Sequence, residues 1–293
     1  MKDEQVALLG LLLGSRISWT EISDRVESRG SASAVLDEFR SEQQTLFDLD
    51  DEVGSWISRA TALLDQWDRE RLHFASLLDP EYPQQLLTVH QRPPFVMWKG
   101  VTSECDRSGV AIVGTRHASD VGISRARELA TGLAKSGVTV VSGLAAGIDT
   151  AAHKGALDAG GRTVAVLGTG LNVSYPKQNA ELQSQIAREG MVLSQFLPDS
   201  PPTKSSFPMR NAVMSGFSLA TVVIEAGWKS GARMQARLAL QHGRRVLLLS
   251  DLRVHDWAQD YGARPGASFV DTVEDILKEL DRLQATQETL VDR

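Results

Sequence analysis

The first 72 residues carry hydrophobic side chains at helical spacing and show no strand pattern. Apolar residues recur at steps of three and four, which places them on one face of a helix: Leu8, Leu9, Leu12, Leu13, Trp19, Ile22 and Val26. The same spacing returns between Trp56 and Trp67. The pattern predicts a small helical N-terminal domain over residues 1–72, with no catalytic motif in it.

The pattern changes from Gly109 onward, where short apolar runs rich in β-branched residues alternate with amphipathic segments. The strand-like runs cover residues 110–113, 138–141, 163–167, 191–193, 220–224 and 245–249, and the helical segments cover 123–134, 148–157, 179–187 and 233–240. One more short apolar strand is predicted ahead of them, over residues 95–98. Continuous hydrophobic strands that alternate with helices indicate parallel strands covered on both faces. We therefore predict an α/β fold with a doubly wound, mostly parallel sheet over residues 73–285. A last helix is expected over 273–283, followed by a loose tail over 286–293.

Four of the predicted strands end in loops that are rich in glycine. These loops cover residues 113–116, 142–149, 168–170 and 225–231. Loops that follow parallel strands gather along one edge of the sheet, and each following helix presents free N–H groups and the positive end of its dipole. The pattern favours an anion-binding edge. The alternative is that the glycines only allow tight turns.

Basic and aromatic residues stand close to this edge. Arg116 directly follows the first of the four strands, and Lys204, Phe207 and Arg210 recur every three residues. Cations and an exposed ring at such spacing can pair with phosphates and stack a base of single-stranded nucleic acid. The alternative is that Phe207 anchors the core and Lys204 is a solvated loop residue.

Two further groups of polar residues have simpler explanations. Lys229, Arg233 and Arg237 form a basic stripe on a predicted helix, which a solvated helix face would explain. Asp149 and His153 lie four residues apart and are candidates for a side-chain network, but capping and packing roles are equally open.

Composition narrows the function classes. The chain is 42% hydrophobic and 23% charged, as in ordinary globular proteins, and its net charge of −6 leaves room only for a local basic groove. Cys105 is the only cysteine, which suits a cytoplasmic location. The apolar run over residues 6–13 is too short to span a bilayer, so no membrane partner is expected. Because the GxxxxGK(S/T) and HExxH motifs are absent, we expect no cofactor, no metal and no catalytic residue.

The ordered series of loops resembles the DprA/Smf family of DNA-processing proteins over residues 78–265. The resemblance rests on several short motifs in the right order: Tyr82-Pro83, Val113-Gly114-Thr115-Arg116, Ser142-Gly143-Leu144-Ala145, Gly147-Ile148-Asp149, Gly168-Thr169-Gly170, Tyr175-Pro176, Phe207-Pro208, Arg210-Asn211, Glu225-Ala226 and Ser230-Gly231. It implies an extended Rossmann-like fold that binds single-stranded DNA without catalysis. It also implies protection of that DNA, help in loading the RecA recombinase during recombination or natural transformation, and a homodimer.

The family's DNA-binding residues carry over onto matching positions of this chain. Side chains that would line the DNA pocket are Arg116, Lys204, Phe207, Arg210 and Asn211. Loop residues that complete the DNA-binding set, several of them against phosphates, are Gly143, Gly147, Gly168, Gly170, Ser230 and Gly231.

Some positions depart from the family pattern. Ala146 and Ala212 stand where the family has arginines, and Gln195 replaces a glutamate. Each missing arginine lowers the slope of log affinity against log salt concentration by at most about one unit. We therefore expect weaker or altered DNA binding and a role that need not be transformation.

Two other functions remain open. The first is a nucleotide-processing or nucleotide-sensing enzyme, similar to phosphoribohydrolases that share this superfamily, with Glu225 as the candidate acid or base. The Gly-Gly-x-Gly-Thr segment associated with those enzymes is absent. The second is a phage-defence adaptor that uses the same fold to sense invading DNA.

Overall fold

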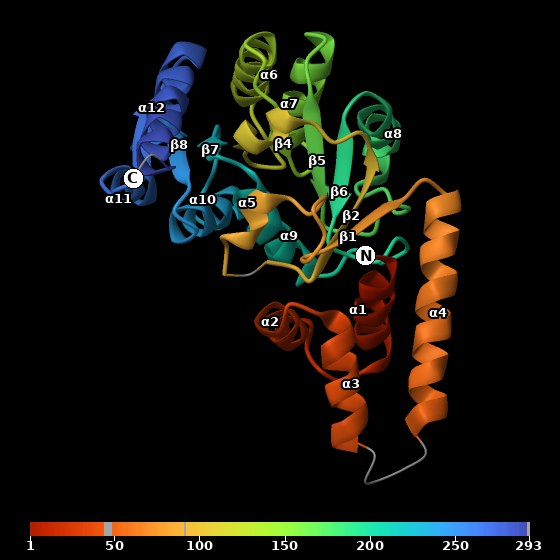
Figure 1. Ribbon diagram of the computed structural model, residues 1–293. Helices are drawn as coiled ribbons and strands as arrows, with labels where there is room; N and C mark the ends of the chain where they lie inside the picture. Colours follow the sequence, from red (N-terminus) through yellow and green to blue (C-terminus); the bar gives the residue numbers. More distant parts are fainter. Residues whose placement is uncertain (44–48, 91, 292–293) are drawn as a thin grey trace.

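The computed structural model describes residues 1–43, 49–90 and 92–291. Four helices form an N-terminal bundle that stands apart from a large sheet and meets one of its edges (Figure 1). They are α1 (Lys2–Gly14), α2 (Trp19–Arg29), α3 (Ala32–Gln43) and α4 (Leu49–Arg69). Helix α1 is the central one, because its residues from Ala7 to Leu12 are all buried.

Local signals and aromatic contacts fix the bundle in place. Ser18 caps α2 by accepting a hydrogen bond from the Glu21 N–H, and Gly30 ends this helix with a positive φ of 65°. Ring contacts then join the bundle to the sheet. The ring centroids of Trp19 and Phe95 are 5.4 Å apart, and those of Trp67 and Phe74 are 6.0 Å apart.

The sheet contains nine strands in the order β1-β2-β6-β5-β4-β3-β7-β8-β9. Their bounds are β1 (His73–Ser76), β2 (Phe95–Gly100), β3 (Val110–Val113), β4 (Val140–Ser142), β5 (Thr163–Leu167), β6 (Met191–Ser194), β7 (Ala220–Val223), β8 (Arg245–Leu249) and β9 (Ala267–Val270). The strands from β6 to β9 are parallel to one another, whereas β1 and β2 are antiparallel to each other and β2 to β6. The predicted doubly wound, mostly parallel α/β sheet is confirmed.

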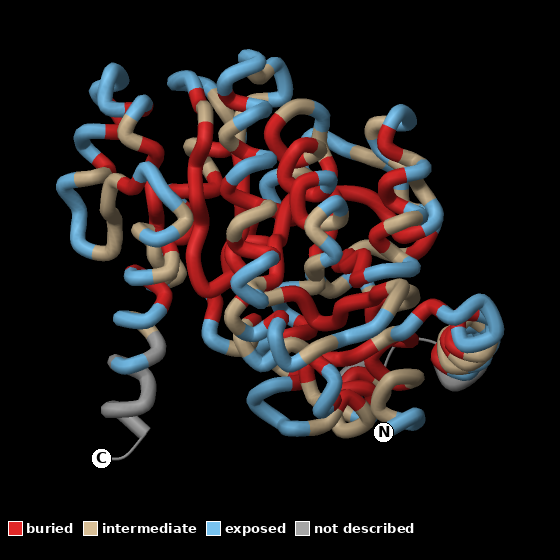
Figure 2. Tube along the Cα trace, turned by 90° about the horizontal axis from the view of Figure 1, so that it is seen from above, coloured by how far each residue is buried: buried red, intermediate tan, exposed pale blue. Residues whose placement is uncertain are grey.

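Helices cover both faces of the sheet, so its central strands are buried (Figure 2). One face packs against α6 (Asp120–Lys135), α7 (Ile148–Asp158), α8 (Ala180–Glu189) and α12 (Val273–Val291). The other packs against α5 (Gln84–Leu87), α9 (Ser206–Phe217), α10 (Gly231–Gln241) and α11 (Asp256–Gly262). Successive residues of β3 point to opposite faces, as a strand requires: Ile112 joins the first core and Val113 the second.

Several elements differ from those predicted. Strands β1 and β9 are absent from the prediction because three residues of β9 are only partly buried and β1 is buried over half its length, which leaves no continuous apolar run. Helix α12 continues to Val291, so the expected end at Leu283 and the loose tail over 286–293 are corrected for the described residues up to 291. Residues 292–293 lie outside the described part of the chain.

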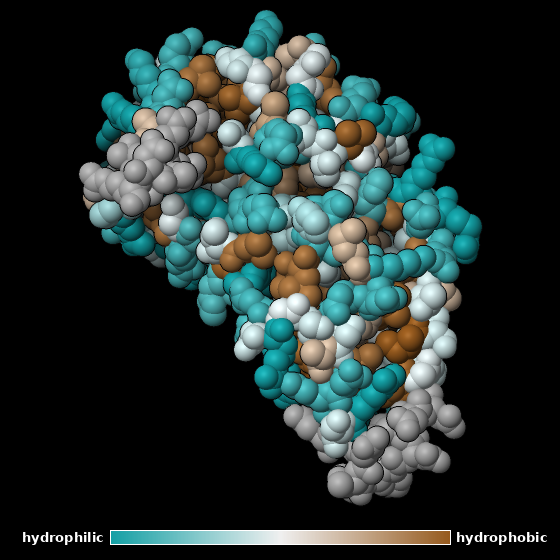
Figure 3. All heavy atoms as spheres, viewed as in Figure 1, coloured by the Kyte–Doolittle hydropathy of each residue, from teal (hydrophilic) through white to brown (hydrophobic). Residues whose placement is uncertain are grey.

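Hydrophilic residues predominate on the face of the molecule that Figure 3 shows, and hydrophobic ones gather there in small separate groups. Within the described ranges, no helix combines the length and apolarity needed to cross a bilayer. The same ranges contain no group of three or more side chains placed to hold a metal ion.

Candidate nucleic-acid interface

The winding of the sheet reverses at β3. The chain runs from β3 through β4 and β5 to β6 on one side, and β7 then returns to the other side of β3. Ligands of doubly wound proteins bind in the crevice where the loops after two such strands diverge. Hydrogen bonds hold these loops together: the Thr115 N–H donates to the Glu225 carbonyl at 2.8 Å, and the Ile224 N–H donates to the Val113 carbonyl at 3.0 Å.

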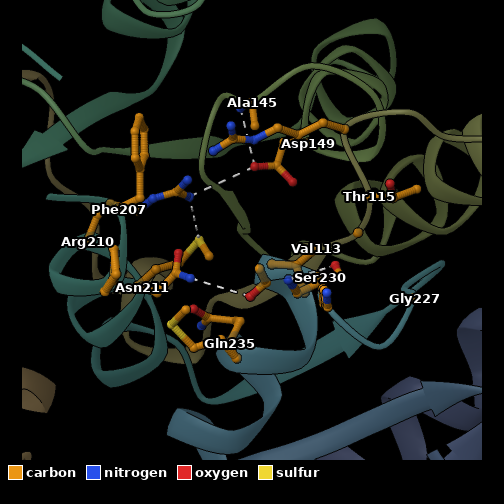
Figure 4. A pocket seen from close by; sticks show the side chains of 18 of the residues that line it. Val113, Thr115, Ala145, Asp149, Phe207, Arg210, Asn211, Gly227, Ser230 and Gln235 are labelled. Carbon is orange, nitrogen blue, oxygen red and sulfur yellow. Dashed lines mark hydrogen bonds and ion pairs between the residues drawn. The ribbon is translucent and has the colours of Figure 1, made fainter. Parts of the chain in front are cut away.

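A cavity of about 530 Å³ lies at this reversal point (Figure 4). Its lining comes from four segments that are distant in the sequence: the loop after β3, the loop after β4 with the start of α7, helix α9, and the loop after β7 with the start of α10. A second cavity of about 80 Å³ shares Arg116, Ala145, Phe207 and Arg210 with the first and extends toward Tyr175. We call the two cavities together the rim groove.

An arginine and two aromatic rings meet in the rim groove. Phe207 is half-buried, and the Arg116 guanidinium lies over its ring, with 5.1 Å from Cζ to the ring centroid. Tyr175, which is 43% exposed, stands with its ring 5.5 Å from that of Phe207. Gly168 makes this arrangement possible, because a Cβ there would come within 2.8 Å of the Phe207 ring. The predicted meeting of a cation and a partly exposed ring is therefore present.

Tyr175 is absent from the predicted site residues. Only the Tyr175-Pro176 pair pointed to this position in the sequence, and it lies in a loop that no strand or helix pattern connects to Phe207. Its proximity becomes visible only in three dimensions.

Arg210 lies beneath the groove and forms a buried ion pair. Both Arg210 and Asp149 are 5% exposed, and Nη1 of the arginine lies 3.9 Å from Oδ2 of the carboxylate (Figure 4). The backbone N–H groups of Gly143 and Ala145 donate to the same oxygen at 3.2 and 3.3 Å. Burial raises the pKa of the Asp149 carboxyl, while Arg210 and the two N–H groups oppose that rise. A Cβ at Gly143 would overlap the Arg210 guanidinium, so this glycine makes room for the arginine.

Lys204, Gly147 and Gly170 are predicted site residues that do not appear in the lining of the groove. Lys204 is exposed in the loop before α9. Gly147 has a φ of 78°, and a Cβ there would come within 2.5 Å of the Thr115 carbonyl oxygen. The Gly170 N–H donates to the Ser200 carbonyl at 2.9 Å. Both glycines thus permit close contact between loops, and a DNA-binding role for all three residues stays a prediction.

Asn211, Ser230 and Gly231 line the groove on the side of α10. The Asn211 amide donates to the Gly231 carbonyl at 3.5 Å and so ties α9 to α10. The Ser230 hydroxyl caps α10 by accepting from the Ala232 N–H at 3.1 Å. These residues position the wall of the groove, whether or not they also contact a ligand.

Glu225 and His153 have structural partners. The Glu225 carboxylate accepts from the Ser119 hydroxyl at 2.8 Å and from the Ser119 N–H at 3.1 Å, which anchors the start of α6. His153 is buried, and its Nδ1 lies 2.7 Å from the Thr163 hydroxyl. Burial lowers the pKa of His153 to about 3, so the ring is neutral near pH 7. The network of His153 with Asp149 that the sequence left open is not formed by a hydrogen bond between the two.

The charge of the groove is positive. Among its described lining residues, Asp149 is the only carboxylate, and Arg210 neutralises it. Arg116 and Lys229 are exposed and make no ion pair with a described carboxylate. The net charge of −6 is therefore carried elsewhere on the molecule.

A Rossmann-like, mostly parallel sheet with a basic, ring-lined groove at its reversal point places the chain in the class of α/β proteins built to hold an anionic ligand. Residues 73–281 match the family described as DNA recombination-mediator protein A. The chain belongs to that family.

Relatives and solved structures agree with this assignment. The DNA processing protein DprA of Streptococcus pneumoniae is 37% identical over 70% of this chain and 73% of its own length. Protein Smf of Synechocystis is 43% identical over 64% of this chain, which spans about half the length of that relative. The X-ray structure of DprA from Streptococcus pneumoniae matches with a TM-score of 0.67 and 32% identity, covering 83% of this chain and 90% of that one. A structure of Helicobacter pylori DprA, described by its single-stranded DNA binding mode, matches with a TM-score of 0.63 and 27% identity. The match covers 72% of this chain and 96% of that one.

The two missing arginines fall in different surroundings. Ala146 lines the smaller cavity of the rim groove, beside Tyr175 and Phe207. Ala212 lies within α9 and is 3% exposed. Only the first position therefore opens directly onto the groove.

Proposed function

We propose that the rim groove binds single-stranded DNA without catalysing a reaction. The observation that carries this proposal is the Arg116 guanidinium over the Phe207 ring, beside the exposed ring of Tyr175. Stacking on an aromatic side chain requires a base that is free of a duplex, and the guanidinium lies where it can pair with the adjoining phosphate. The positive lining supports the same ligand, as does Gly168, which leaves room for the Phe207 ring.

We further propose that the whole protein protects single-stranded DNA in recombination, helps load a RecA-type recombinase and acts as a cytoplasmic homodimer. Membership of the recombination-mediator family and the likeness to a Helicobacter pylori protein described as binding single-stranded DNA support this role. Failure to speed recombinase assembly on single-stranded DNA would remove the loading role. A monomer mass in light scattering would remove the homodimer.

The geometry favours binding over nucleotide hydrolysis. Glu225, the candidate acid or base, does not line the described groove and is engaged by Ser119. A general acid or base must reach the proton that it transfers. We therefore expect a panel of nucleoside monophosphates to release no free base, and release that is lost in Glu225→Gln would support the enzyme instead.

Charge reversal at Arg116 tests the binding proposal. In fluorescence anisotropy across a salt series, we expect the chain to bind oligo-dT more tightly than duplex, with affinity that falls as salt rises. Arg116→Glu should weaken oligo-dT binding and lower the salt slope by about one unit, since one phosphate contact is lost.

Arg188→Glu is the matched control. Arg188 is exposed on α8, next to the start of β6 and hence at the opposite edge of the sheet. Equal affinities and equal salt slopes for the two variants would contradict the proposal.

A further inference from the structure

A second exposed ring lies beside the rim groove. Trp228, in the loop between β7 and α10, is 61% exposed. It borders a cavity of about 270 Å³ that is also lined by Lys229, Ser230, Arg233, Met234, Arg237 and Tyr261. Lys229, Ser230 and Met234 line the rim groove as well, so the two hollows adjoin.

The indole of Trp228 is supported from beneath by alternating guanidinium and aromatic groups. Cζ of Arg233 lies 3.7 Å from the Trp228 ring centroid and 5.8 Å from that of Tyr261, whose ring also lies 4.5 Å from Cζ of Arg264. Nη1 of Arg233 donates to the Trp228 carbonyl at 3.0 Å, which fixes the arginine against the loop. The ring is thus held in place although most of its surface meets solvent.

The surroundings of Trp228 carry positive charge. Lys229, Arg233 and Arg237 line the hollow, and no carboxylate lines it among the described residues. None of these three cations makes an ion pair with a described carboxylate. A solvated helix face would explain Arg237, but it does not explain an exposed indole held on an arginine.

We propose that Trp228 is an outer stacking subsite for single-stranded DNA, which continues the path of the strand beyond the rim groove. A base stacks on the open face of the indole, and Lys229 and Arg237 pair with the flanking phosphates. The inference rests on the proposed function of the groove and extends it from one ring cluster to two. A strand that reaches both clusters gains stacking that a shorter strand lacks.

The length of the oligonucleotide provides the test. We expect Trp228→Ala to weaken binding of a long oligo-dT about fivefold to a hundredfold, the effect of losing one stacking partner, while the shortest oligo-dT that binds is unaffected. Trp228→Phe should restore most of the loss because it keeps an aromatic face. Val254→Ala is the control and should change nothing at any length, because this residue is 80% exposed and ends the short 3-10 helix over Ser250–Val254.

Tryptophan fluorescence gives a readout that a structural role would not move. Long oligo-dT should quench part of the wild-type emission, and Trp228→Phe should lack that part. Thermal unfolding should leave the variants equal, since the ring is exposed.

The possible outcomes distinguish a failure of the Trp228 subsite from a failure of the rim groove. If the wild type binds oligo-dT and Trp228→Ala binds every length equally well, the subsite is refuted and the rim groove remains. If Trp228→Ala instead changes the molar mass in light scattering and leaves the length dependence intact, the ring belongs to a protein interface and the proposal is overturned. If the wild type binds no oligo-dT, the proposed function of the groove falls with it.

Discussion

Arg210 forms an ion pair inside the protein and is not free on its surface. The sequence places it in a regular series with Lys204 and Phe207, which predicts a phosphate contact, but its side chain is buried against Asp149. Local spacing cannot reveal this, because Asp149 stands on a different helix and comes close only through the fold. The structure thus gives Arg210 a role in holding the loop after β4, and its contact with DNA stays a prediction.

Removing the positive charge of Arg210 should destabilise the fold. We expect Arg210→Met, which keeps much of the side-chain volume, to cost about 3–5 kcal/mol in the free energy of unfolding, since it leaves the Asp149 carboxylate buried without an opposite charge. Urea denaturation followed by circular dichroism measures this.

A surface pair serves as the comparison for Arg210. Arg127 and Asp158 form an ion pair in which both side chains are more than half exposed, and Arg127→Met should cost less than about 1 kcal/mol. If Arg210→Met also lowers the free energy of unfolding by less than about 1 kcal/mol, the buried pair contributes little to stability.

Helix α9 sets the position of the ring cluster at the scale of elements. Phe207 and Arg210 stand three residues apart on it and so face the same side, whereas Lys204 precedes the helix and does not continue the row. The sequence does not predict α9, because every residue from Arg210 to Phe217 is buried and no amphipathic period is left to detect. The strand ends are different, since glycine and polar residues mark them directly in the sequence.

The elements that carry Ala146 and Ala212 predict opposite effects for the same substitution. Ala146→Arg adds a cation to a loop that lines the groove, so we expect a folded protein whose oligo-dT binding has a salt slope steeper by up to about one unit. Ala212→Arg inserts a charge into a buried position of α9, so we expect a loss in the free energy of unfolding. Anisotropy and urea denaturation separate the two outcomes. A stable Ala212→Arg protein with a steeper slope would mean that α9 is placed differently.

The class of the fold follows from the sequence, but its order of strands does not. Buried strands that alternate with helices predict a doubly wound sheet, and seven of the nine strands fall on predicted runs. The reversal at β3, which creates the groove, depends on pairings between β3 and β7 that lie more than a hundred residues apart. Likewise, the edge strands β1 and β9 lack a continuous buried pattern and are fixed by their neighbours.

Charge at the scale of the whole molecule is divided rather than uniform. The net charge of −6 coexists with a groove whose one described carboxylate is neutralised. An acidic body with one basic edge directs a polyanion to that edge and repels it elsewhere. The place where single-stranded DNA binds on the molecule is therefore the central question.

Photocrosslinking answers it most directly. Oligo-dT carrying 5-bromodeoxyuridine is bound and irradiated, and the attached peptides are identified by mass spectrometry. Because a stacked base lies in van der Waals contact with its ring, we expect attachment at Phe207 or Tyr175 and its loss in Phe207→Ala. Attachment confined to the helices of the N-terminal bundle, with none at either ring, would contradict the account.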